Sequence, residues 1–178
     1  MAAREIVTLP APILRAKARR VKSVTPEIRQ LLDDMVETVR LAPGVGLAAP
    51  QVGIGLRVIV VEYAESSEDP DAAPKQPKLY TCVNPEIVRR SSETISGAEG
   101  CLSIPGYLGE VDRHAAITVK GLNRQGEPFR VKATGWLARI FQHEIDHLDG
   151  VLFIDRATDV WKATQDEVEQ AEGAPAAA

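Results

Sequence analysis

The sequence predicts one folded domain, residues 1–178, that combines amphipathic helices with short β-strands. Apolar residues recur at helical spacing over 26–41 and again over 134–148. Segments rich in β-branched residues lie between them, and two of these flank a short polar turn, as in a hairpin. Charged residues make up 26% of the chain and carry both signs, a composition typical of a folded protein.

The N-terminal part of the chain is expected to hold one long helix. Residues 7–21 mix apolar and basic side chains around two prolines, which favours an irregular lead-in with one helical turn. Pro26 suits the first position of a helix, so the periodic segment 26–41 is predicted to be helical. Residues 44–53 are mostly small, and their backbone is expected to approach a ligand closely.

The middle of the chain is predicted to be mostly strand. Residues 56–63 are β-branched and should form a central strand, and residues 64–78 should form an acidic surface insertion. A proline separates the next two predicted strands. The remaining predicted strands are 79–84, 86–90, 115–120 and 128–132, the last two forming a hairpin.

The C-terminal part is predicted to contain a second long helix, over 134–148. A short strand at 151–154 and a last helix at 158–170, anchored by Trp161, are expected after it. Residues 171–178 are expected to be a flexible tail.

The pattern H-E-x-x-H lies in the second long helix, at His143, Glu144 and His147. Residues four apart lie on the same helix face, so both imidazoles can bind one cation. Glu144 follows the first ligand and can serve as the general base for a metal-bound water. Asp146 is expected to orient one of the ligands. The simpler alternative is a solvated helix that carries two histidines.

Cys101 is the best candidate for a third ligand. Taken alone, it could be a buried structural thiol. However, the chain has only three histidines, and the third, His114, is expected at an exposed strand edge. Cys101 lies in a loop rich in Gly and Pro and offers a soft donor, so it is preferred.

Composition excludes several classes of protein. No apolar run approaches the ~20 residues of a membrane span, and the N-terminus lacks a secretory signal, so a cytoplasmic location is expected. Cys82 and Cys101 would be reduced there, and Cys82 is expected to be a small core residue. The net charge of −4 argues against nucleic-acid recognition, and the cations between Arg15 and Lys22 are interpreted as a solvated face.

Three stretches together resemble the peptide deformylases, which remove the formyl group from the N-terminal methionine of newly made bacterial and organellar proteins. They are Gly-Val-Gly-Leu-Ala-Ala-Pro-Gln at 44–51, Glu-Gly-Cys-Leu-Ser at 99–103 and Gln-His-Glu-Ile-Asp-His at 142–147. The resemblance spans roughly residues 5–155. It implies an α+β fold in which antiparallel β-sheets wrap around a central helix carrying H-E-x-x-H, with an N-terminal helix and a short C-terminal helix.

The resemblance also implies a role for each matching residue. Cys101, His143 and His147 would hold the metal, with water as the fourth ligand, and Glu144 would be the acid and base. The metal would be Fe²⁺, with Zn²⁺ or Ni²⁺ as substitutes. The remaining roles would be stabilisation of the oxyanion by Gln51 and the backbone N–H of Leu102, and alignment of the substrate by backbone groups of Val45 and Gly46.

The substrate would be the formylmethionyl end of a nascent chain. Trp136 and Ile140 share a helix face with the histidines and are expected to line a pocket for its unbranched side chain. Only a formyl hydrogen is expected to fit on the other side of the metal. A transient contact with the ribosome is implied as well, although the C-terminus here is short and acidic, unlike the basic helix through which some members dock.

Two other functions are compatible with part of the pattern. A zinc endopeptidase would share H-E-x-x-H, but it would normally recruit a third ligand downstream, and no histidine follows His147. A catalytically inactive module could keep the metal and bind N-terminal methionines. Such a module would need neither Glu144 nor Gln51. For Gln51 taken alone, a solvent-facing amide is the alternative to a role at the site.

Overall fold

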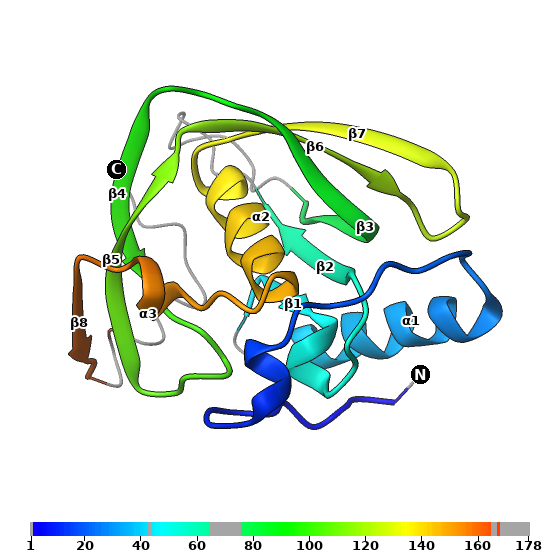
Figure 1. Cartoon of the computed structure of the whole chain (residues 1–178), viewed down its shortest axis with the longest axis horizontal. Helices are drawn as coiled ribbons and strands as arrows, with labels where there is room; N and C mark the ends of the chain where they lie inside the picture. Colours follow the sequence, from blue (N-terminus) through cyan, green and yellow to red (C-terminus); the bar gives the residue numbers. More distant parts are fainter. Residues whose placement is uncertain (1, 43, 65–75, 165–166, 168–178) are drawn as a thin grey trace.

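The computed structural model describes residues 2–42, 44–64, 76–164 and 167, and Figure 1 labels its elements. The helices are α1 (Pro26–Leu41), α2 (Gly135–Leu148) and α3 (Phe153–Arg156), with 3₁₀ turns η1 (Pro12–Arg15) and η2 (Ala49–Val52). The strands are β1 (Gly46–Ala48), β2 (Val58–Tyr63), β3 (Lys78–Arg90), β4 (Thr94–Glu99), β5 (Tyr107–His114), β6 (Ala116–Leu122), β7 (Pro128–Thr134) and β8 (Asp159–Lys162). The two long helices and the β6–β7 hairpin therefore confirm the sequence predictions.

Two antiparallel sheets lie on either side of α2. One has five strands in the order β1-β2-β3-β6-β7, and the other has three in the order β4-β5-β8. Figure 1 shows α2 in the middle, with β4, β5 and β8 on one side and the larger sheet on the other. The expected α+β architecture with a central helix is confirmed.

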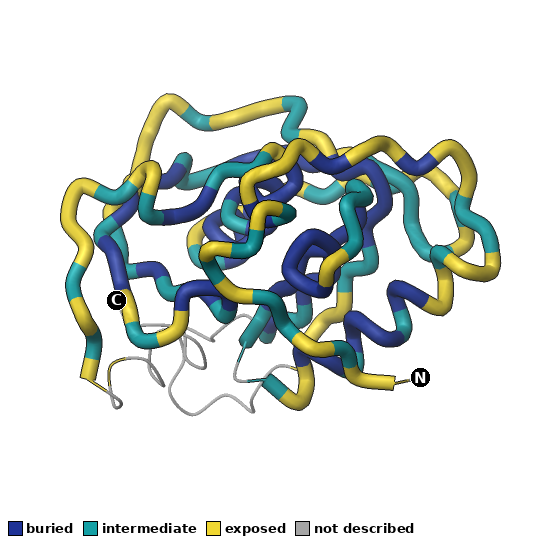
Figure 2. Tube along the Cα trace, turned by 60° about the horizontal axis from the view of Figure 1, so that its bottom comes forward, coloured by how far each residue is buried: buried dark blue, intermediate teal, exposed yellow. Residues whose placement is uncertain are grey.

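Side chains that alternate along β2 contribute to two separate hydrophobic clusters. Ile59 and Val61 belong to the cluster that α2 fills with Ile140 and Phe141. Their neighbours Val58 and Val60 belong to the cluster formed with α1. Because successive side chains of a strand point to opposite faces, the larger sheet is covered by a helix on each side. In Figure 2 the buried segments gather inside the molecule and the exposed ones run around its periphery.

Two predicted strands form a single one. Residues 79–84 and 86–90 both belong to β3, which continues through Pro85. The pairing with β6 shifts register between Val83 and Glu86. Such an irregularity accommodates a residue without an N–H, so the proline interrupts the ladder without ending the strand.

Two predictions near the C-terminus are wrong. Residues 151–154 do not form a strand, because α3 begins at Phe153. The helix expected over 158–170 begins instead as β8, which pairs with β5 and places Trp161 opposite Leu108. Most of the rest of that helix, most of the 64–78 insertion and the 171–178 tail lie outside the described residues. No helix in the described part is long and apolar enough to cross a membrane.

Candidate metal centre and active site

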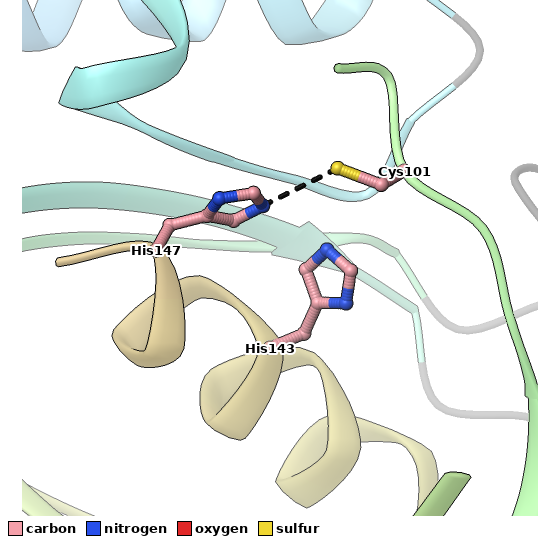
Figure 3. Close-up of side chains that lie close together, drawn as sticks. All are labelled: Cys101, His143 and His147. Carbon is pink, nitrogen blue, oxygen red and sulfur yellow. Dashed lines mark hydrogen bonds between the residues drawn. The ribbon is translucent and has the colours of Figure 1, made fainter. Parts of the chain in front are cut away.

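Three side chains converge between α2 and the loop after β4. His143 and His147 stand one turn apart on α2, with ring centroids 5.0 Å apart. Cys101 follows the end of β4, and its Sγ lies 3.3 Å from Nε2 of His147. The donor atoms of the three residues all lie within 4.8 Å of one another. Figure 3 shows the three side chains pointing toward one another. The structure thus brings the three predicted ligands into a group that could hold a metal ion.

A buried carboxylate fixes the orientation of His143. Nδ1 of His143 lies 2.9 Å from Oε2 of Glu99. The other carboxylate oxygen, Oε1, accepts hydrogen bonds from Arg113 and Arg139. Burial alone would raise the pKa of Glu99, but hydrogen bonds from Arg113 and His143 hold it well below its usual range. Because an ionised carboxylate only accepts, Nδ1 carries a proton, and Nε2 is the ring nitrogen left to face the other ligands. Figure 3 shows Nε2 turned toward the other two donors.

Glu99, and not Asp146, is therefore the carboxylate that orients a histidine. Asp146 instead accepts hydrogen bonds from Arg113 at 2.6 Å and from Arg156 at 2.6 Å. It reaches His143 only indirectly, through Arg113 and Glu99. The available sequence signal was that Glu99 stands two residues before the predicted thiol ligand, inside the same motif.

The two imidazoles differ in their affinity for protons. Burial lowers the pKa of His143, but hydrogen bonds to Cys101 and Glu99 outweigh it and raise the pKa well above the usual value. For His147, burial and the nearby charges of His143 and Arg113 lower the pKa well below the usual value of histidine. Hydrogen bonds and nearby charges therefore distinguish the two imidazoles, although both lie on α2 one turn apart.

Glu144 is buried beside this group. Its carboxylate Oε1 faces Gly46, and no hydrogen-bond partner of its buried Oε2 is found among the described residues. Burial and, further, the charge of Glu99 raise the pKa of Glu144 to about 7, although His143 and Arg113 oppose the shift. A carboxyl group with a pKa near neutrality can both take up and release a proton.

Gln51 is buried, with 2% of its surface exposed, so the solvent-facing alternative is wrong. Its Oε1 accepts a hydrogen bond of 2.8 Å from the N–H of Ala48. Its amide is therefore oriented with Nε2 toward the centre, 3.6 Å from Sγ of Cys101 and 3.3 Å from Oγ of Ser103. The side chain thus presents an N–H donor to the centre.

A pocket of about 510 Å³, including the part open to solvent, gives access to these groups. Its size is typical of small-ligand sites. Every predicted site residue except the deeper His147 lines it. The lining residues are Gly44, Val45, Gly46, Gln51, Glu99, Gly100, Cys101, Leu102, Trp136, Arg139, Ile140, His143 and Glu144. Arg139 was not predicted; its guanidinium lies 5.7 Å from the centroid of the Trp136 ring.

The remaining cysteine and histidine lie apart from this group. Cys82 is buried in the core between the larger sheet and α2, as predicted, and burial raises the pKa of its thiol. His114 is half-buried, and its Nδ1 lies 2.7 Å from the carbonyl oxygen of Ser91, so it is not the exposed residue expected.

Comparison with known proteins agrees with this geometry. Residues 3–163 match the polypeptide deformylase family model. A peptide deformylase of Symbiobacterium thermophilum is 48% identical over 172 residues, 97% of this chain and 75% of that protein. One of Desulforudis audaxviator is 48% identical over 162 residues, 91% of this chain and 98% of that protein.

Solved structures show the same similarity. The peptide deformylase of Thermotoga maritima superposes with a TM-score of 0.77 at 38% identity, covering 89% of this chain and 100% of that one. The Ehrlichia chaffeensis enzyme in complex with actinonin gives a TM-score of 0.79 at 37% identity. The match covers 96% of this chain and 94% of that one. The chain therefore belongs to the polypeptide deformylase family, whose metal-dependent members remove the N-formyl group from the N-terminal methionine of nascent chains.

Proposed function

We propose that the chain, a hydrolase that removes N-formyl groups, works with one divalent metal held by Cys101, His143 and His147. The convergence of their three donor atoms within 4.8 Å carries the proposal. A buried carboxyl group lines the pocket beside them. Together these groups suit the hydrolysis of a formamide to formate and a free amine.

The donor set fits a transition metal. One sulfur and two imidazoles are soft or borderline ligands, which favour Fe²⁺, Zn²⁺ or Ni²⁺ over Mg²⁺ or Ca²⁺. We propose Fe²⁺ as the working metal, following the family resemblance, with Zn²⁺ or Ni²⁺ as substitutes. A bound divalent metal supplies hydroxide at neutral pH by lowering the pKa of water from 15.7 to about 7.

Glu144 is proposed to move the proton. Its carboxylate takes a proton from the attacking water and delivers it to the amine as the C–N bond of the formamide breaks. Its position in the pocket and its pKa of about 7 support this role, because both protonation states are accessible at neutral pH.

Two N–H donors are proposed to stabilise the oxygen that becomes negative in the attack. One is Nε2 of Gln51, whose amide is oriented by Ala48. The other is the backbone N–H of Leu102, a pocket residue next to Cys101 in the chain. Fixed donors of this kind need no reorganisation as the charge develops.

The substrate is proposed to lie along β1. This strand is at the edge of the larger sheet, and Val45 and Gly46 line the pocket there. Trp136 and Ile140 line it from α2 and offer apolar surface for the methionine side chain. We further propose that the enzyme acts in the cytoplasm and contacts the ribosome only transiently, without recognising a nucleic-acid sequence.

A formate-release assay on a formylmethionyl peptide tests the function, with Glu144→Ala as the control. We expect formate without cleavage of the peptide bonds, and loss of turnover in the variant. Cleaved peptide bonds would indicate a protease, and bound metal without turnover would indicate a binding module. Elemental analysis of protein purified without oxygen identifies the metal, and a preparation that is active without any transition metal would overturn the proposed centre.

A further inference from the structure

We infer that Phe153 is a positioning residue for His143, holding its imidazole in the orientation that ligation requires. The inference rests on the proposed metal role of His143. It assigns a function to α3, a single helical turn that supplies no proposed ligand but lies next to the H-E-x-x-H residues in space. Figure 1 shows α3 between α2 and the smaller sheet.

The two rings face each other. Their centroids are 6.4 Å apart, and their planes differ by 18°, an offset parallel arrangement. Phe153 is 1% exposed and belongs to an apolar cluster that also contains Cys101. It therefore lies beside the ring of His143 and in the same apolar cluster as Cys101.

His143 needs this packing contact because one hydrogen bond does not fix the orientation of its ring. The terminal torsion of histidine has broad minima. Glu99 anchors Nδ1 at 2.9 Å, but the ring can still tilt about that contact. The edge of His147 limits the tilt on one side, at an interplanar angle of 68°, and the face of Phe153 limits it on another.

Phe153 is itself held firmly. A Cβ at Gly109 on β5 would lie 2.9 Å from Cε2 of Phe153, so the strand backbone supports the ring directly. The chain reaches this place because Gly150, with φ of +73°, turns it back after α2. Phe153 thus lies between the backbone of β5 and the ring of His143.

The experiment compares Phe153→Leu with Phe141→Leu in Co²⁺-loaded protein. Both phenylalanines are buried, at 1% and 0% exposure, so both variants lose similar packing. Phe141, however, packs in the core of the larger sheet, with its ring centroid 5.4 Å from that of Tyr80. The readouts are the visible spectrum of Co²⁺ and the rate at which excess chelator removes it.

We expect Phe153→Leu to release Co²⁺ about tenfold faster and to shift its spectrum, as does the loss of other groups that orient a ligand. Phe141→Leu should be destabilised in thermal unfolding yet release Co²⁺ at the wild-type rate. Equal release from both variants, or wild-type release from Phe153→Leu, would overturn the inference while leaving the proposed metal centre in place.

A second variant covers the case in which Phe153→Leu does not fold. Gly109→Ala keeps every aromatic ring. Its Cβ would crowd Phe153 at 2.9 Å, as well as Ala157 and the backbone of Asp159, so the Co²⁺ spectrum should shift. An unchanged spectrum would count against the inference. If wild-type protein shows no sulfur-to-cobalt charge-transfer band, the proposed centre fails, and the inference fails with it.

Discussion

Gly46 leaves the space that the carboxylate of Glu144 occupies. A Cβ at position 46 would lie 2.5 Å from Oε1 and 2.9 Å from Cδ of Glu144. Real Cβ atoms do not approach this closely, so a side chain there would have to displace the carboxylate. Gly46 therefore positions the proposed acid and base, in addition to offering its backbone to the substrate.

Gly46→Ala should reduce formate release by about 10²-fold, the effect of displacing a catalytic group by roughly 1 Å. Metal content should be unchanged, because none of the three proposed ligands is moved. Gly55→Ala is the matched control, since nothing lies within 4 Å of a Cβ built there. Full activity in Gly46→Ala would contradict the proposed role of Glu144.

Glu144→Gln keeps the shape of the side chain and removes its ability to accept a proton. We expect kcat to fall by about 10²–10⁴-fold while the metal content and the thermal unfolding temperature stay close to wild type. Stopped assays of formate and elemental analysis of the same samples check this. A variant that keeps its turnover would show that another group moves the proton.

Gln51→Ala should lower kcat by about 10²–10³-fold, the usual cost of losing one oxyanion donor. Ser103→Ala is the control: it removes one of the two partners of Gln51 Nε2, and Ala48 still holds the amide in place. We expect near wild-type kcat for the control. Equal losses in both variants would indicate a structural role for this hydrogen-bonded pair.

An acetylmethionyl peptide should be hydrolysed far more slowly than its formyl counterpart. We expect the difference because only a formyl hydrogen fits beside the metal in the proposed binding mode. Paired measurements of kcat/KM on the two peptides check this. Equal rates would remove the hypothesis that the small formyl group determines the choice of substrate.

Asp34 should make stability depend on pH at the N-terminus. Burial would raise the pKa of Asp34, but hydrogen bonds from Gln30, the N–H of Ala2 and Arg4 lower it below its usual value. A depressed carboxyl pKa stabilises the fold above the unfolded value near 4, and this stability is lost as the pH falls through the folded pKa.

Asp34→Asn should therefore cost about 1 kcal/mol at pH 7, and the difference from wild type should shrink below about pH 4. Urea unfolding of both proteins across this range measures it. Asp33→Asn is the comparison, because Asp33 pairs with Arg124 instead. A difference that grows toward acid pH would show that the pKa shift has the opposite sign.

Local patterns predicted the helical part of the site well. The spacing of His143 and His147 places them on one helix face whatever surrounds the helix, since that geometry repeats every 3.6 residues. Local composition predicted a loop of small residues before β2, but the structure forms β1 and η2 there. It also left the burial of Gln51 open. Short apolar segments were harder: 151–154 turned out to be part of a helical turn, since periodicity does not distinguish a strand from a helix over four residues.

The sequence by itself determined the two long helices, the hairpin, the paired histidines and the resemblance to a family. Only the tertiary structure decided that Glu99 orients His143, that Phe153 packs against the same ring, and that Gly46 makes room for Glu144. The first group depends on residues a few positions apart, where backbone geometry dictates the neighbours. The second depends on residues brought together by chain reversals, so their contacts arise only when the sheets close around α2.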